Sequence, residues 1–279
     1  MFTNLTNSAK ACLFFVLTFG LTVVVSLLYP LLGEMTVFIH MYTPTLAALI
    51  MMLVVTRDGY SKAGWATLGL HHPGLRWWLL AILWPLVVIS AVYGIVWNTE
   101  VAQAVFPDGS QLGEMASNMA IGLGISSALA LGEEIGFRAY LLPRLMHLGT
   151  GRALLLSGLL HAIWHFPLML LTPVYPILGS WLIVGPIILL TLTTAGVFYG
   201  YLQLTSKSVW PTTLAHGTIN LSFELFAELT LTTSPLALEY LAGETGVLTL
   251  VATALSAAAL LYHLRQRRSS LTVQQPSGV

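Results

Sequence analysis

The chain has 279 residues, of which 56% are hydrophobic and 8% are charged, and its mean hydropathy is +0.82. Several stretches are long and apolar enough to cross a bilayer, so the composition predicts an integral membrane protein. The formal net charge is zero and the sequence has no long basic block, which argues against nucleic acid as a partner. The single cysteine, Cys12, excludes an intramolecular disulfide framework.

In chain order, the apolar runs predict an all-α polytopic membrane protein with about eight transmembrane helices, since roughly 20 residues cross the hydrocarbon layer. The first run lacks the basic opening of a cleaved signal peptide, so we expect it to remain as a membrane helix. The fourth run exceeds one span and contains Pro143, which predicts a kink or an extension past the bilayer. The runs lie near residues 11–31, 35–56, 76–97, 116–146, 152–172, 177–203, 209–230 and 244–264.

No soluble domain is left over, because the longest connections, around 57–75 and 98–115, are too short to fold alone. We therefore expect residues 1–279 to form a single integral membrane domain, followed at its end by a polar tail over about 265–279. The sequence shows no internal repeat.

The charged residues sort by side in this eight-helix arrangement. One face receives every lysine and arginine except Arg138, which lies inside the fourth helix near that same face, while the opposite face receives acidic residues alone. By the positive-inside rule both termini are cytoplasmic, with the protein in the plasma membrane if the organism is prokaryotic. The basic positions are Lys10, Arg57, Lys62, Arg76, Arg144, Arg152, Lys207, Arg265, Arg267 and Arg268, and the acidic ones are Glu34, Glu100, Asp108, Glu114, Glu239 and Glu244.

Three polar clusters lie inside predicted membrane helices, where an ionisable group costs about 3 kcal/mol and needs a partner, a water-filled cavity or a function. They are EEIGFR with Glu133, Glu134 and Arg138, HAIWHFP with His161 and His165, and WPTTLAHGTIN with His216 and Asn220. At 1.5 Å per residue they lie roughly 13–20 Å from the cytoplasmic ends of their helices. Three helices thus bring carboxylate, imidazole and amide groups to similar depth, as an active site or a coordination site requires.

Each cluster also has a structural interpretation. Glu134 and Arg138 are four residues apart on one helix face and can form a buried ion pair that fixes helix register. His161 can be a hydrogen-bonded packing residue of the membrane interior. Glu224 approaches the outer end of its helix and can be interfacial, so the sequence leaves the roles of His161 and Glu224 open.

The clusters contain groups sufficient for hydrolysis of a peptide bond. One glutamate can hold a water molecule and act as general base while the other pairs with the arginine, and a histidine and an asparagine can stabilise the oxyanion. Two histidines and a glutamate can instead bind zinc, although no HExxH motif is present. Intramembrane glutamate and histidine can also form the proton relay of a transporter, but clusters confined to one half of the membrane argue against a path across it.

At these residues the sequence resembles the family of CAAX proteases and bacteriocin-processing enzymes (CPBP, also called Abi), which includes the Ras-converting CAAX endopeptidase. The motifs match in order: EExxxR at Glu133, Glu134 and Arg138, a motif ending in WH-hydrophobic-P at His165, and a histidine four residues before Asn or Asp at His216 and Asn220. The resemblance covers about residues 55–225. One departure is His161, which stands where the second family motif has its aromatic residue; the WHFP context favours His165 as the functional histidine.

The resemblance implies a glutamate-dependent intramembrane endopeptidase, a kind of enzyme also labelled metalloprotease. It implies that Glu133 and His165 activate water, that Glu134 and Arg138 support the site, and that His216 and Asn220 form the oxyanion pocket. We expect no cofactor, with zinc as the alternative. The expected partners are membrane lipids and a peptide or lipidated protein substrate, of CAAX or bacteriocin-maturation type, presented from the cytoplasmic leaflet. The alternative functions are a non-catalytic immunity or adaptor protein that binds a peptide in the same cavity and a proton-coupled transporter.

Overall fold

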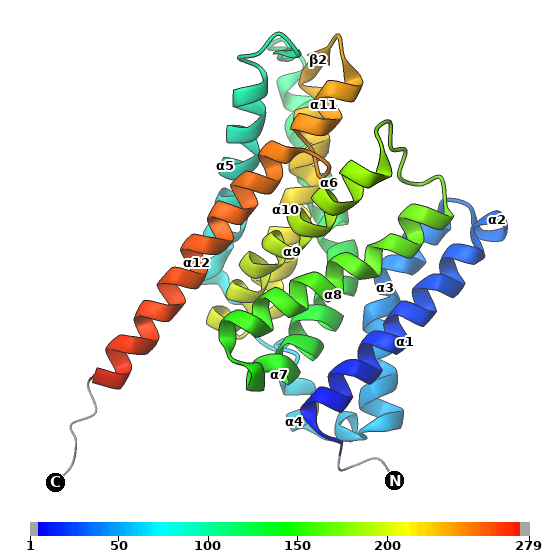
Figure 1. Cartoon of the computed structure of the whole chain (residues 1–279), viewed down its shortest axis with the longest axis vertical. Coiled ribbons are helices and arrows are strands. Elements are labelled where there is room, and N and C mark those ends of the chain that lie inside the picture. Colours follow the sequence, from blue (N-terminus) through cyan, green and yellow to red (C-terminus); the bar gives the residue numbers. More distant parts are fainter. Residues whose placement is uncertain (1–4, 274–279) are drawn as a thin grey trace.

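The computed structural model describes residues 5–273, with side chains described for residues 5–266, and consists of long helices packed side by side (Figure 1). Helices suit these apolar runs because a backbone in lipid must satisfy its own hydrogen bonds. The helices are α1 Asn7–Leu27, α2 Tyr29–Leu32, α3 Met35–Ile50, η1 Met51–Val55, η2 Asp58–Tyr60, α4 Lys62–Ala66, η3 Leu75–Trp77, α5 Trp78–Val96, α6 Leu112–Glu134, η4 Ile135–Leu141, α7 Leu142–Leu145, η5 Met146–Leu148, α8 Thr150–Leu171, α9 Trp181–Ser206, α10 Val209–Glu228, α11 Pro235–Leu241 and α12 Val247–Val273.

Within the described residues, seven helical segments are long and apolar enough to cross a membrane, which confirms the all-α polytopic prediction. They are Asn7–Leu27, Met35–Val55, Leu75–Val96, Leu112–Leu148, Thr150–Leu171, Trp181–Ser206 and Val247–Gln266. The remaining predicted span, 209–230, corresponds to α10, a helix of 20 residues. It is not among the seven because polar residues such as His216, Asn220 and Glu224 interrupt its apolar surface.

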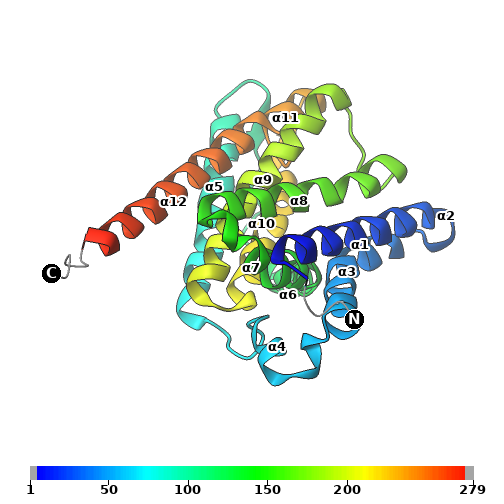
Figure 2. The same cartoon turned by 60° about the horizontal axis from the view of Figure 1, so that its bottom comes forward.

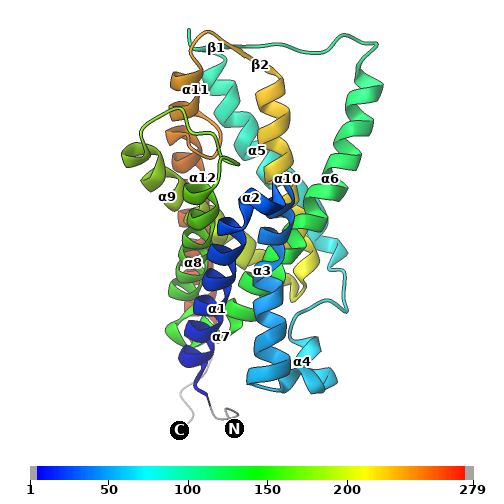
Figure 3. The same cartoon turned by 90° about the vertical axis from the view of Figure 1, so that its right-hand side faces the viewer.

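A two-stranded antiparallel sheet, which the all-helical prediction did not include, joins two of the connections. Strand β1 (Ala102–Ala104) pairs with strand β2 (Thr230–Thr232), so the loop after α5 is tied to the loop after α10. The sheet and α11 lie together at one end of the molecule (Figure 3). Three-residue strands carry too little alternation to be predicted from sequence.

The opposite end of the molecule contains the start of α1, the short helices α4 and α7, and the end of α12 (Figures 1 and 3). Lys10, Lys62 and Arg144 belong to these elements, so basic residues gather at this end as the charge pattern predicts. Helix α12 runs along the edge of the bundle (Figure 2) and continues to Val273, so most of the predicted polar tail is helical. The remainder of that tail and the side chains of Arg267 and Arg268 lie outside the described residues.

The predicted long fourth helix is a 37-residue segment in which α6 continues through η4, α7 and η5. The η4 turn is π-helical: the backbone N–H of Leu142 donates to the carbonyl of Phe137, five residues earlier. Such wide turns in otherwise α-helical segments are frequent at functional sites. Here the π-helical segment lies between the glutamates at the end of α6 and Pro143, and it contains Arg138.

Glycine allows the helices around the polar clusters to approach closely. A Cβ atom at Gly217 of α10 would lie 2.5 Å from Oγ of Ser127 on α6, and one at Gly136 of η4 would lie 2.3 Å from Cβ of Pro44 on α3. Small residues at such crossings let backbones pack together in membranes. These two contacts bring α3 and α10 against the segment that contains the adjacent glutamates.

Candidate active site

The two adjacent glutamates end helix α6, and both are buried, with 1% of Glu133 and none of Glu134 exposed. Glu134 Oε1 accepts a hydrogen bond from Arg138 Nη1 at 3.3 Å, and His216 Nδ1 lies 2.8 Å from the same oxygen. The predicted pairing of Glu134 with Arg138 is therefore present. The structure extends it to His216, so that Glu134 connects α6, η4 and α10.

Glu133 binds a different histidine. Its Oε2 atom lies 2.7 Å from His161 Nε2, and Nδ1 of the same ring lies 2.8 Å from Arg138 Nη1. A guanidinium only donates hydrogen bonds, so Nδ1 accepts, and the neutral ring carries its hydrogen on Nε2 and donates it to Glu133. His161 therefore bridges the arginine and the first glutamate, a link that the sequence left open.

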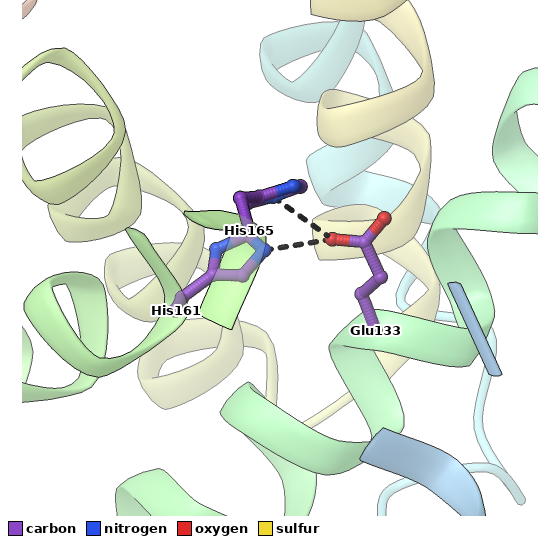
Figure 4. A group of neighbouring side chains, drawn as sticks. All are labelled: Glu133, His161 and His165. Carbon is purple, nitrogen blue, oxygen red and sulfur yellow. Dashed lines mark hydrogen bonds and ion pairs between the residues drawn. The ribbon is translucent and has the colours of Figure 1, made fainter. Parts of the chain in front are cut away.

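His165, one turn further along α8, approaches the same carboxylate oxygen without hydrogen bonding to it. Its Nε2 atom lies 3.7 Å from Glu133 Oε2, and Figure 4 shows both histidines converging on that oxygen. The Nδ1 atom of His165 and the Oε1 atom of Glu133 are buried and have no hydrogen-bond partner in the described structure. These atoms can bind a water molecule or a substrate.

Four of the predicted site residues line one small internal cavity of about 60 Å³. Glu133, His165, His216 and Asn220 all line it, and the volume holds only a few water molecules. The described contacts place Asn220 on the wall without a hydrogen bond to the other three. The structure thus brings all six predicted site residues into one region, four on the cavity wall and Glu134 and Arg138 behind it.

Further residues that the sequence reasoning did not assign to the site also line the cavity. Among them are His40 of α3, Tyr199 of α9 and Glu244 of the loop before α12. His40 satisfied the same criterion as the other clusters, an ionisable residue inside an apolar run, whereas Tyr199 gave no signal. Glu244 was placed with the acidic loops of the opposite face, and that placement is incomplete because the loop folds inward to the cavity.

Tyr199 forms part of the cavity wall and contacts both His216 and Arg138. Its ring stacks on His216, with centroids 4.9 Å apart and planes at 15°, and the guanidinium of Arg138 lies 5.1 Å from the ring centroid. Both contacts fix groups that bind Glu134. Glu224, in contrast, is exposed and lines a separate groove of about 610 Å³ between α6 and α10.

Three of the residues lie close enough together to hold a metal ion. One oxygen of Glu133 and one nitrogen each of His161 and His165 all lie within 4.8 Å of one another. Two imidazoles and a carboxylate are a ligand set that zinc accepts. Whether these three residues suit a metal ion depends on the hydrogen-bond partner of each ligand's other polar atom.

The fold and the site together define a polytopic helical membrane protein with a buried glutamate–histidine centre. Residues 115–222 match the family model described as "Type II CAAX prenyl endopeptidase Rce1-like". That stretch contains all six predicted site residues, so the resemblance to the CAAX protease family is confirmed over it. It starts later than the predicted family-like core, which began near residue 55. No curated protein matches the chain.

Proposed function

We propose that this protein is an intramembrane endopeptidase that hydrolyses a peptide bond with a water molecule activated by Glu133 and His165. One observation carries the proposal: His161 holds one oxygen of Glu133, while the other oxygen and the nearby His165 Nδ1 have no protein partner. A carboxylate fixed in this way beside an imidazole is positioned as a general base. The family match over residues 115–222 supports the same activity.

In the proposed reaction the water oxygen attacks the scissile carbonyl, Glu133 takes the proton, and the proton passes to the leaving amine. His216 and Asn220 stabilise the oxyanion from the same cavity wall. His216 Nδ1 faces the Glu134 carboxylate, so its Nε2 donates to the oxyanion in the charged form of the ring.

The proposed reaction requires no tightly bound metal, because the surroundings of His161 do not fit a metal ligand. A histidine that ligates a metal through Nε2 normally donates from Nδ1 to a carboxylate or a carbonyl. Here Nδ1 faces the guanidinium of Arg138 at 2.8 Å, which can only donate. The ring would have to accept on both sides. This mismatch favours a hydrogen-bonded glutamate over a zinc centre.

Chelation tests this directly. We expect the purified full-length protein to keep its activity in EDTA or phenanthroline and to contain much less than one zinc per chain by elemental analysis. Stoichiometric zinc that is lost together with activity on chelation, and whose return restores it, would contradict the proposal.

We propose a prenylated or otherwise lipid-anchored peptide as the substrate class, as the description of the matching family suggests. We further propose that the chain acts as one integral membrane unit with both termini cytoplasmic, in the plasma membrane if the organism is prokaryotic. The basic residues Lys10, Lys62 and Arg144 support this, because they belong to elements at the end of the molecule that contains the start of α1. Substrate would then reach the site from the cytoplasmic leaflet. Cleavage of a tagged substrate only from the outer side of sealed vesicles of known orientation would refute this topology.

The test of activity compares wild type with Glu133→Gln and His165→Ala in membranes at matched expression. Loss of a general base lowers rates by about 10²–10⁴-fold, so we expect cleavage of a CAAX peptide to fall by that factor in the first variant and strongly in the second. Glu224→Gln is the matched control, since Glu224 is exposed and lines another groove.

Undiminished cleavage in both variants would show that the carboxylate and the imidazole are structural. The adaptor and transporter functions would then replace hydrolysis, and peptide binding without cleavage would favour the adaptor.

A further inference from the structure

His40 of α3 is a buried histidine that the proposed reaction does not use. Its side chain is 1% exposed, and it lines the same cavity as Glu133 and His165. The ring centroids of His40 and His165 lie 5.8 Å apart. Neither ring nitrogen of His40 has a hydrogen-bond partner in the described structure.

The ring of His40 is oriented by its neighbours. It stacks on the indole of Trp164, with centroids 3.9 Å apart and planes at 13°. The indole Nε1 donates to Thr43 Oγ1 at 3.0 Å, and the hydroxyl of Thr43 donates to the backbone carbonyl of His40. These contacts fix the plane of the imidazole and leave its polar edge without a protein partner.

Burying a polar group without a hydrogen bond is destabilising. A phenylalanine would stack equally well on Trp164 and avoid this cost. Packing alone therefore does not account for a histidine at this position. His165 lines the same cavity and its Nδ1 is also unpartnered, so two imidazoles with unpartnered nitrogens line one space.

We propose that His40 is a substrate-binding residue whose neutral imidazole accepts a hydrogen bond from the N–H of a peptide group next to the scissile bond. A peptide group offers an N–H donor, and a neutral imidazole has one nitrogen that accepts a hydrogen bond, so the unpartnered ring of His40 can bind it while His165 stays with the water. The proposal rests on the proposed function for its reaction. The contact itself requires only that a peptide enters the cavity.

The test uses binding and cleavage in parallel, with the full-length protein in detergent and a panel of fluorescent peptides that end in farnesylated or unmodified CAAX sequences. In the Glu133→Gln background we expect His40→Phe to weaken peptide binding about tenfold, the loss of one buried hydrogen bond, without lowering the melting temperature. In the Glu133-containing protein, kcat/KM should fall at least as much. His40→Gln should retain part of the binding, and His263→Phe, the same change at an exposed histidine, should have no effect.

A peptide with an ester in place of the amide next to the scissile bond separates contact from folding. For that peptide His40→Phe should cost little, because the N–H that it would no longer bind is already missing. Equal binding and equal kcat/KM for wild type and His40→Phe would overturn the inference while leaving the proposed function intact. Binding that depends on His40 without any cleavage would retain the inference and refute the endopeptidase. Failure of the wild type to bind any peptide of the panel would refute both.

Discussion

At the residue scale, one guanidinium organises the hydrogen bonds of the candidate site. Arg138 donates to Glu134 and to His161 from the same Nη1 atom, and the partners of these two residues are His216 and Glu133. The arginine therefore fixes the hydrogen position on His161 and supplies the positive charge beside Glu134. Its own side chain is fully buried, so the charge has no access to solvent.

Removal of the Arg138 charge should destabilise the folded protein. Breaking a buried ion pair by deleting one partner destabilises by about 3–5 kcal/mol, so we expect Arg138→Gln to lower the melting temperature sharply and to abolish activity. Arg138→Lys keeps the charge but loses the planar fork and should fold better while remaining poorly active. Arg152→Gln, at an exposed position, is the control in thermal denaturation; an Arg138→Gln protein as stable as this control would contradict the role of the buried charge.

The sequence predicted which residues meet but not how they bind. Glu133, His165 and His216 were recognisable because ionisable groups are costly inside an apolar helix. His161 and His165 lie one turn apart on one helix face, so sequence alone could not tell which of them hydrogen-bonds Glu133. That choice depends on the π-helical turn that places Arg138 beside His161, a feature of the backbone with no clear sequence signal.

At the element scale, the site depends on the close crossing of α6 and α10. Ser127 and Gly217 meet at this crossing. Ser127 lies six residues before Glu133 on α6, and Gly217 directly follows His216 on α10. The approach of the two backbones sets how far His216 reaches toward Glu134. A small change in helix separation therefore changes a hydrogen bond of the site.

We expect Gly217→Ala to separate the two helices. The added methyl group would lie 2.5–2.8 Å from atoms of Ser127, and overpacking of this kind costs about 1–3 kcal/mol. The cleavage rate should fall by more than the loss of folded protein explains, because His216 moves with α10. Gly94→Ala is the matched control, because a Cβ atom there meets nothing within 4 Å. Equal cleavage rates for the two variants would show that this crossing does not position His216.

The elements themselves were largely predictable, and the exceptions have physical reasons. Apolar runs of sufficient length predicted the membrane helices to within a few residues, because lipid leaves few alternatives to a helix. The inward path of the loop that contains Glu244 could not be predicted, since a short acidic loop normally remains in solvent. Its position depends on contacts between distant parts of the chain.

At the scale of the whole molecule, the loop between α11 and α12 closes one side of the cavity with Glu244. This residue lies outside the membrane-spanning helices as the structure defines them. Burial raises the pKa of the Glu244 carboxyl above its ordinary value of 4.5, and attraction to His216 offsets part of the rise. The folded protein therefore binds this proton more tightly than the unfolded chain.

The sign of the pH effect follows from linkage. A carboxyl whose pKa is raised on folding contributes stability that is fully present below its unfolded pKa and is lost as pH rises through its folded pKa. We expect the melting temperature of the wild type, relative to Glu244→Gln, to fall as pH rises from about 4.5, the ordinary value. The difference between the two proteins isolates this residue from other titrating groups. A difference that is constant with pH would contradict the raised pKa.

The cavity of about 60 Å³ admits water but no peptide, so the conformation described here is a latent one. The proposed peptide substrate must therefore bind a minor population in which the cavity is open, or supply the free energy that opens it. Its apparent affinity is then lower than its intrinsic affinity by the fraction of molecules that are open. Any influence that widens the bundle, such as a thinner bilayer or a substitution that loosens α12, should make the same peptide bind more tightly without adding a single contact to it.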